Sequence, residues 1–331
     1  MSTDTATAPA PTPVRPPDRA RAGGRLAWYA LRRLLHMAGV VWAVATIVFF
    51  LVNVIGNPAA LMLPPDATQE QVDQLTHDLG LDRPLLERYW DYISGLAHGN
   101  FGESLWLHEP VLKAIGTALV PSLALTSVTM LVTFFLAVLL GTLAAARQNG
   151  IVDKIVSGVA FVAVSVPDFW VGLLLVAAFA VRLRWVPTSG YGAAAYFVLP
   201  VLTLMTRPLG RILSTTRSSL IEELGHEHIA TALAKGLARP LVLVRHGLRN
   251  SLITSITLTG DEVANLIGGA VVVETIFAWP GMGRLSLQAI QNRDLNLVIG
   301  LTVVTALFVL VTNLLLEMSY RFLDPRIRRR R

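Results

Sequence analysis

Six long apolar segments constrain this sequence of 331 residues more than any other feature. A helix needs about 20 apolar residues to cross the roughly 30 Å hydrocarbon layer of a membrane. Hydrophobic residues make up 53% of the chain and charged residues 15%, a balance that excludes an ordinary soluble domain. The sequence therefore predicts an all-α, polytopic membrane protein with six transmembrane helices. The predicted spans are Leu34–Ile55, Leu119–Ala146, Ile155–Val181, Val198–Leu213 (interrupted by Arg207, Pro208 and Arg211), Leu252–Val273 and Leu297–Tyr320.

The positions of the basic residues predict how these spans are oriented. With both termini on the cytoplasmic side, 21 of the 28 Lys and Arg residues fall on cytoplasmic segments. Membrane proteins carry this excess on the inner side, and an even number of spans places both termini there. We therefore expect a multi-pass membrane protein with both termini in the cytoplasm. The sequence pI of about 10.0 then reflects contact with membrane lipid at the inner leaflet rather than with nucleic acid.

The spans divide the chain into five regions. They are a disordered, basic and Pro-rich cytoplasmic tail (1–33), the first span (34–55), a helical segment outside the membrane (56–118), a membrane core (119–320) with a charged cytoplasmic loop at 222–250, and a basic cytoplasmic tail (321–331). The chain has no cysteine, which excludes disulfides and thiolate metal sites.

The outer segment contains signals for two helices. Thr68 and Gln71 form a capping box, and apolar residues follow at helical spacing until Gly80 ends the helix. A second helix is predicted to begin near Pro84. Its apolar stripe is typical of packing against neighbouring protein rather than of ligand binding. The stripe consists of Leu85, Tyr89, Ile93 and Leu96.

The cytoplasmic loop contains a short amphipathic helix. Glu227, Thr231 and Lys235 recur at four-residue spacing, and Gly236 is placed to end the helix. A second helical stretch is expected after Pro240. Because the first helix is too polar for hydrocarbon, we expect it to lie at the membrane surface and to contact a partner protein.

Ionisable residues inside the predicted spans call for an explanation, since each costs a few kcal/mol or more at membrane depth. Asp168 follows Pro167 in the third span, and Asp261 and Glu262 lie near Asn265 in the fifth. One interpretation is that Asp168, Asp261, Glu262 and Asn265 line a pathway that favours a cationic group. The other is that the carboxylates pair structurally with Arg207, Arg211 or a partner subunit.

No signature of catalysis accompanies these spans. The sequence lacks the GxxxxGK[ST] phosphate loop, so this chain is not expected to hydrolyse ATP, and it is not expected to bind a cofactor or metal of its own. His226 and His228 flank Glu227 without metal-site spacing and are expected to face solvent or a partner. A transporter driven by ions, with the membrane carboxylates as proton sites, remains an alternative.

Four separated segments carry recognisable motifs: LGLDRPLLERYWDYISGLAHGNFGESL (79–105), ELGHEHIATALAKGLARPLVLVRHGLRNSL (from Glu223), GGAVVVETIFAWPGMGRLSLQAIQNRD (268–294) and the C-terminal LDPRIR. They resemble the membrane subunits, or permeases, of ABC importers for dipeptides, oligopeptides and nickel, a resemblance that implies a bacterial cytoplasmic membrane. The outer segment resembles that of the subunit preceding its partner permease in the usual gene order.

This resemblance implies a fold, a function and a set of partners. The fold would be that of a type I importer permease, and the function ATP-driven import of a peptide or a related small solute such as a nickel chelate. The partners would be a second homologous permease, an extracytoplasmic substrate-binding protein, and two ATPases that hold ATP and Mg. The residues that match the family's ATPase-coupling loop are Glu227, Thr231, Ala232, Ala234, Lys235 and Gly236; His228, Ala230 and Leu233 depart from it.

The third motif includes a turn-rich outer segment. Glycine and proline at such spacing permit a re-entrant or gating loop, and equally a rigid turn. The residues concerned are Glu274, Trp279, Pro280, Gly281 and Gly283.

Overall fold

The computed structural model describes residues 19–54, 59–60, 63, 66–78 and 80–323. The two predicted tails were 1–33 and 321–331, and most of each lies outside the described residues, at 1–18 and 324–331. The first helix, α1 (Arg19–Val54), begins within the predicted disordered tail, and the last, α15 (Leu295–Leu323), extends into the predicted C-terminal tail. Alanine, arginine and leucine favour helix, so a helix can continue past the apolar stretch on which the prediction rested. The chain divides into two compact units inside α1, between Val40 and Val41.

Helices suited to crossing a membrane include the first, second and last predicted spans. Among the described residues, three helices are long and apolar enough to cross a membrane: Leu31–Leu51 within α1, α5 (Val111–Ala146), and Leu295–Met318 within α15. Two bent helix pairs raise this number to as many as five. The fifth predicted span, residues 252–273, falls mostly on α12 (Arg249–Gly269), which is not apolar enough to count as a membrane span on the same criteria.

The third and fourth predicted spans are both bent rather than straight. Pro167 separates α6 (Ile151–Ser165) from α7 (Asp168–Leu175), which continues as the π-helix η1 (Val176–Arg182), and the two halves meet at 106°. Val166 is extended, as residues before proline prefer. The fourth span bends by 58° between α8 (Ala195–Leu204) and α9 (Thr206–Leu224).

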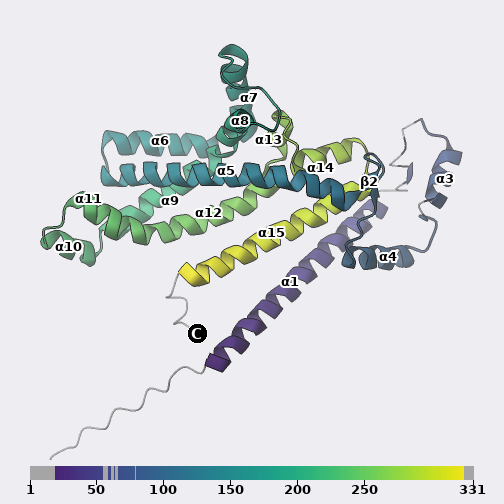
Figure 1. Cartoon of the computed structure of the whole chain (residues 1–331), viewed down its shortest axis with the longest axis horizontal. Coiled ribbons are helices and arrows are strands. Elements are labelled where there is room, and N and C mark those ends of the chain that lie inside the picture. Colours follow the sequence, from purple (N-terminus) through teal and green to yellow (C-terminus); the bar gives the residue numbers. More distant parts are fainter. Residues whose placement is uncertain (1–18, 55–58, 61–62, 64–65, 79, 324–331) are drawn as a thin grey trace, which may run out of the picture. The chain divides into compact units, whose positions relative to one another are not determined.

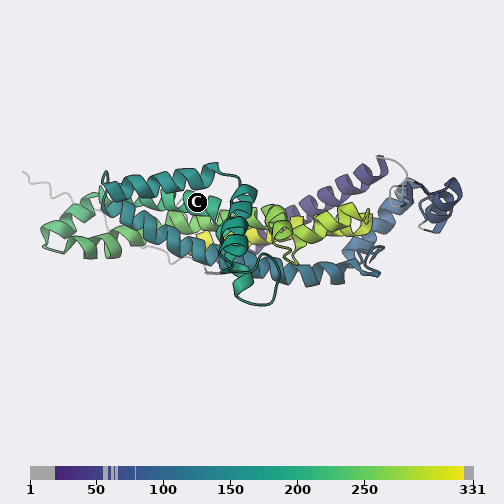
Figure 2. The same ribbon diagram turned by 90° about the horizontal axis from the view of Figure 1, so that it is seen from above.

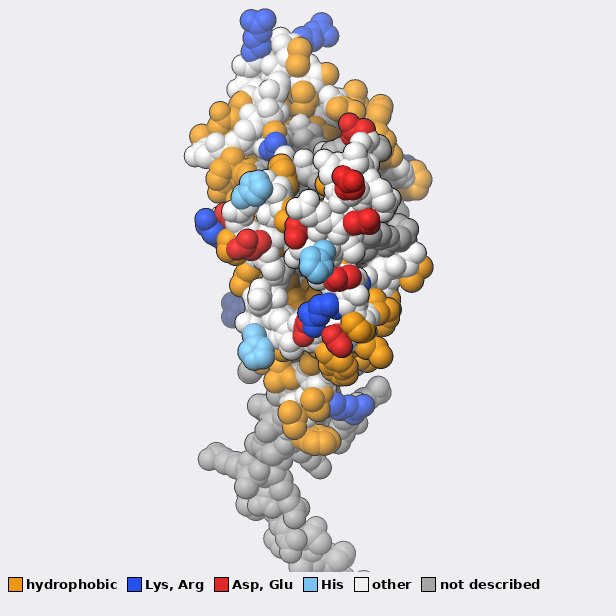
Figure 3. Space-filling model, turned by 90° about the vertical axis from the view of Figure 1, so that its right-hand side faces the viewer, with side chains coloured by type: hydrophobic (Ala, Val, Ile, Leu, Met, Phe, Trp, Pro, Cys, Tyr) orange, Lys and Arg blue, Asp and Glu red, His pale blue; other side chains and the backbone are white. Residues whose placement is uncertain are grey.

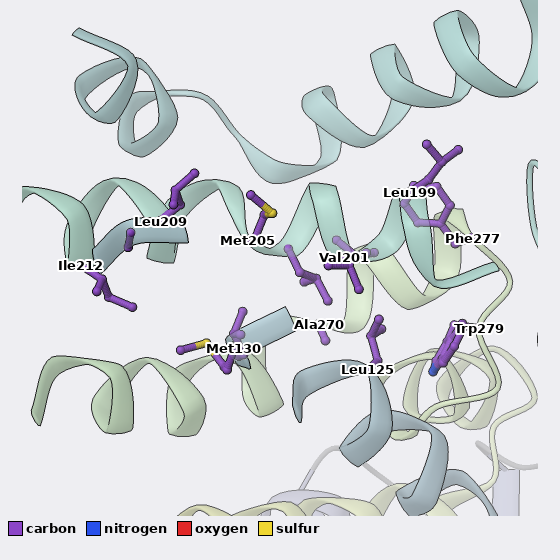
Figure 4. Packing of buried hydrophobic residues seen from close by; sticks show 14 of the residues in the cluster. Leu125, Met130, Leu199, Val201, Met205, Leu209, Ile212, Ala270, Phe277 and Trp279 are labelled. Carbon is purple, nitrogen blue, oxygen red and sulfur yellow. The ribbon is translucent and has the colours of Figure 1, made fainter. Parts of the chain in front are cut away.

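Helices α5, α6, α9 and α12 lie side by side (Figures 1 and 2), with α5 packed against the other three. Helix α9 can approach α6 closely because residue 210 is glycine: a Cβ there would lie 2.5 Å from the carbonyl oxygen of Ala160. The main hydrophobic core fills the space between α5, α8, α9 and the segment after α12 (Figure 4). Its labelled members are Leu125, Met130, Leu199, Val201, Met205, Leu209, Ile212, Ala270, Phe277 and Trp279.

The outer segment forms two helices, as predicted, α3 (Gln69–Asp78) and α4 (Leu85–Ala97). The backbone N–H of Thr68 donates to Gln71 Oε1 at 2.9 Å, and the N–H of Gln71 donates to Thr68 Oγ1 at 3.4 Å, which confirms the capping box. Two short antiparallel strands, β1 (Glu103–Ser104) and β2 (Glu109–Pro110), were not predicted. Acidic side chains gather on the face of the molecule shown in Figure 3.

The apolar stripe of α4 packs partly against the outer end of α1. Tyr89 is buried, its ring contacts Phe49, and its hydroxyl lies 2.9 Å from Thr46 Oγ1. Arg88 donates to Asn53 Oδ1 at 2.8 Å. Packing against neighbouring protein is therefore confirmed for Tyr89, whereas Leu85 at the start of the stripe is exposed.

Candidate functional site

The predicted cytoplasmic helix is present as α10 (Glu227–Ala234), and Gly236 follows it with φ +84°, the left-handed conformation that ends many helices. Ile229 and Ala232 are buried against Val242 and anchor the helix. The opposite face is open. Of the residues matching the coupling loop, the exposed ones are Glu227, Thr231, Ala234, Lys235 and Gly236; Ala232 is buried.

Glu223 holds this helix to its neighbours, a role that the sequence analysis did not predict. Its Oε1 accepts a hydrogen bond from Asn250 Nδ2 at 2.6 Å and lies 3.2 Å from His228 Nε2. One carboxylate thus joins α9, α10 and α12. The helical stretch before α12 begins one residue before Pro240, as α11 (Arg239–Val242), and continues through the π-helix η2 (Leu243–Leu248). A cleft beside α10 is lined by His228, Arg245, His246, Arg249, Asn250 and three apolar residues of α12.

One side of α12 is polar along its whole length. Every third or fourth residue there is exposed, which places the exposed residues within one narrow stripe of the helix. They are Asn250, Thr254, Thr257, Asp261, Asn265 and Gly268. Because of this polar stripe, α12 is not apolar enough to count among the candidate membrane spans. The spacing of these polar residues can be read from the sequence, but the sequence analysis named only Asp261 and Asn265 among them.

Helix α9 presents a matching polar stripe. Its exposed or half-exposed residues include Arg207, Arg211, Ser214, Ser218 and Glu222. The two helices run antiparallel and are joined at three levels, by Glu223 with Asn250, by a 2.8 Å hydrogen bond between the Thr216 and Ser255 hydroxyls, and by an ion pair between Arg211 and Glu262. We refer to the two stripes together as the polar face.

The exposed residues of α5 and α6 are mostly apolar. On α5 they include Phe135 and Leu139, and on α6 Val159, Phe161 and Val162. These side chains suit contact with lipid, whereas arginine, aspartate and asparagine at membrane depth must face water or protein. The polar face is therefore the side of this chain that turns away from lipid.

The four membrane residues predicted to line a pathway have different surroundings. Glu262 is buried and its Oε1 accepts from Arg211 Nη1, the structural pairing left open by the sequence. Asp261 and Asn265 are exposed on the polar face. Asp168 is half-buried at the start of α7, and its Oδ1 is buried without a hydrogen-bond partner.

The outer turn is densely packed, which favours the rigid-turn interpretation over a gating loop. It joins α13 (Val271–Ile276) to α14 (Met282–Gln291). Glu274 is buried and accepts from Ser122 Oγ at 2.5 Å and from the N–H of Arg284 at 3.1 Å. Trp279 is fully buried, and its Nε1 donates to the carbonyl of Pro121 at 3.0 Å. Pro280 is exposed, whereas Gly281 is buried and Gly283 half-buried.

Replacing Gly281 by alanine is expected to destabilise the protein. A Cβ at this position would lie 2.2 Å from Glu274 Oε1 and 2.4 Å from Ser122 Oγ, so the buried hydrogen bond must shift. Overpacking of this kind costs about 1–3 kcal/mol. Thermal unfolding of the detergent-purified protein measures the effect. Gly268→Ala is the matched control, since a Cβ there meets nothing within 4 Å; equal unfolding temperatures for both variants would contradict the packing of the turn.

Comparison with known proteins places these features in a family. The family model described as "Binding-protein-dependent transport system inner membrane component" matches residues 137–329, and its N-terminal companion model matches residues 26–126. A probable peptide ABC transporter permease protein, y4tP of Sinorhizobium fredii, is 36% identical over 310 residues, covering 91% of this chain and 99% of the relative. The glutathione transport system permease protein GsiC of Escherichia coli K12 is 33% identical over 301 residues, covering 91% and 98%.

A solved structure supports the fold. The MetNI methionine ABC transporter, in inward-facing conformations, matches 64% of this chain and 97% of its own chain, with a TM-score of 0.52 and 15% sequence identity.

Proposed function

Because this chain belongs to the family of binding-protein-dependent transport system inner membrane components, as a permease subunit of an ABC importer, we propose that its polar face forms one wall of a path for peptides. The chain is a multi-pass membrane protein and a transport component, and the family does not favour the ion-driven alternative.

One observation carries the pathway assignment. Polar and charged residues are exposed along α9 and α12, while most of the exposed residues of α5 and α6 are apolar. A second permease facing this one with a similar surface would enclose a water-filled path between the two chains. The Arg211–Glu262 pair lies at the junction of the two stripes, where it holds them together beside that path.

Peptides are the cargo class that the relatives support. One relative is named for peptides and the other for glutathione, which is itself a tripeptide. Both cargoes carry an ammonium group and at least one carboxylate. The polar face offers both signs of charge, with Arg207 on α9 and Asp261 on α12.

Helix α10 is the proposed contact for the ATPases. Its buried face is fixed by Ile229 and Ala232, and its exposed face carries Glu227 and Lys235, so a partner can engage it without unfolding it. In this arrangement the loop and both termini are cytoplasmic, two ATPases bind ATP and Mg, and the outer segment meets a substrate-binding protein. ATP-driven approach of the ATPases would then reorient the helices as rigid bodies.

Reconstituted transport tests this proposal. The complex that co-purifies with the tagged chain is placed in liposomes with its binding protein, and import of radiolabelled trialanine is followed with ATP. ATP-dependent import supports the proposal, and a complex whose ATPases cannot hydrolyse ATP is the control. Import driven by a proton gradient alone, or no import of trialanine, would contradict it.

A further inference from the structure

Three side chains of the polar face lack partners within the part of the chain that the structure describes. There the side chains of Arg207, Asp261 and Asn265 form no hydrogen bond and no ion pair. This is unlike Arg211 and Glu262, which neutralise each other. Polar groups left unpaired inside a membrane are costly and usually serve a substrate or ion.

These residues lie deep in the membrane core. Arg217 pairs with Asp153 in the first turn of α6, which marks one end of that helix. Arg207 is ten residues further along α9, or about 15 Å at 1.5 Å per residue. Asp261 is eleven residues from Asn250 on α12, about 17 Å. Both positions are therefore well inside a hydrocarbon layer of roughly 30 Å.

The arrangement has two charged ends. Measured from the Arg211–Glu262 pair, Arg207 lies about 6 Å along the helix axes in one direction, and Asn265 about 4–5 Å in the same direction. Asp261 lies about 1–2 Å in the opposite direction. The cationic end, Arg207 with Asn265, is thus separated from the anionic end, Asp261, by about 8 Å. An extended peptide spans at most about 3.3–3.6 Å per residue, so two or three residues match this separation.

We propose that Arg207 and Asn265 bind the C-terminal carboxylate of a di- or tripeptide in transit, and that Asp261 binds its ammonium group. This proposal rests on the proposed function. A guanidinium and a side-chain amide are both donors to a carboxylate, and charge-assisted hydrogen bonds are strengthened where water is scarce.

The carboxylates near Arg207 leave its guanidinium available to bind a peptide carboxylate. The positive charge of Arg207 acts on Asp168 and on Glu262, yet no ion pair forms with either. Glu262 is already engaged by Arg211, and Asp168 remains half-buried with an unsatisfied Oδ1. Arg207 therefore forms no ion pair among the described residues, which leaves its guanidinium free to bind an incoming carboxylate.

Import of three blocked and unblocked peptides tests the assignment. The probes are trialanine, trialaninamide and N-acetyltrialanine, and the complex is the reconstituted importer with its binding protein. Arg207→Gln is expected to slow import of trialanine at least tenfold and to leave that of trialaninamide unchanged. Asp261→Asn is expected to slow trialanine at least tenfold and to leave N-acetyltrialanine unchanged. Because all variants use the same binding protein, its own preferences cancel in these comparisons.

Control variants separate carboxylate binding by Arg207 from a role of Arg207 in subunit contact. Arg207→Lys should recover most of the import of trialanine, and Val159→Ala, on the apolar surface of α6, should change none of the rates. Equal slowing of trialanine and trialaninamide by Arg207→Gln would overturn the carboxylate role while leaving the proposed function intact. Loss of the partner permease from purified Arg207→Gln complexes would instead assign Arg207 to subunit contact and overturn the proposal. Absence of ATP-driven import by the unmodified complex would overturn the proposed function and this proposal together.

A second measurement does not depend on the cargo. The chain has no cysteine, so Gly268→Cys introduces one thiol, exposed on the polar face within about 3 Å of Arg207 along the helix axes. An anionic methanethiosulfonate reagent should react there faster than a cationic one, and Arg207→Gln should lower the ratio of the two rates about tenfold. An unchanged ratio would overturn the role of Arg207, whichever peptides the binding protein delivers.

Discussion

Replacing Gly236 by proline is expected to abolish cargo-stimulated ATP hydrolysis by the assembled importer. Gly236 has φ +84°, and its N–H donates to the carbonyl of Leu233 at 2.9 Å. Proline fixes φ near −65° and has no N–H, so the chain must leave α10 in another direction. Glu227→Lys is expected to act similarly, because it reverses an exposed charge in the first turn of α10. The measurement is ATP hydrolysis by the reconstituted complex, with at least a tenfold loss of stimulation.

A matched control exists in the outer segment. Gly99 follows α4 with φ +75°, and its N–H donates to the carbonyl of Leu96 at 3.0 Å, so Gly99→Pro imposes the same backbone change. The Gly99→Pro variant should co-purify with its ATPase subunits as the unmodified chain does, and the Gly236→Pro variant should lose them. Unaltered stimulation in both Gly236→Pro and Glu227→Lys would remove α10 from the coupling mechanism.

Replacing Arg211 and replacing Glu262 are expected to lower the stability of the protein by different amounts. The Glu262 side chain is 4% exposed, whereas that of Arg211 is 40% exposed on the polar face. Arg211→Met leaves a buried carboxylate without a partner, a change that costs about 3–5 kcal/mol. Glu262→Gln leaves an arginine that can turn toward water, so we expect a loss of about 1 kcal/mol. Unfolding of the purified chain by denaturing detergent gives both values.

The double variant Arg211→Met with Glu262→Leu completes this test. Replacing a buried ion pair by apolar residues is often neutral, so the double variant should be more stable than Arg211→Met alone. A double variant less stable than either single variant would show that the pair does not join α9 to α12 as the structure has it.

Features set by neighbouring residues could be predicted from the sequence. The capping box of Thr68 and Gln71 and the end of α10 at Gly236 depend on contacts within a few residues, and the structure confirms both. The family motifs led to the correct fold because they are spread along the chain, within the two family models that match residues 26–126 and 137–329.

Features set by distant residues could not be predicted. Ser122 and Glu274 are separated by 152 positions, and nothing local shows that they share a buried hydrogen bond, so a gating loop and a rigid turn fitted the sequence equally well. Proline interrupts a helix, so a break at Pro167 can be read from the sequence, but the size of the bend depends on how α7 packs against α8 and α13. The coupling loop's anchor, Glu223, was missed because its partner Asn250 lies 27 residues away.

The central claim is that the polar face borders water inside the membrane, and thiol accessibility tests it most directly. Thr257 and Val159 both lie eight residues into their helices, α12 and α6, and both are exposed, so Thr257→Cys and Val159→Cys are matched for depth. A charged, membrane-impermeant thiol reagent is applied to the reconstituted importer, and labelling of each single cysteine is timed. We predict that Thr257→Cys reacts at least a hundredfold faster than Val159→Cys. Equal rates, or faster labelling of Val159→Cys, would contradict the claim.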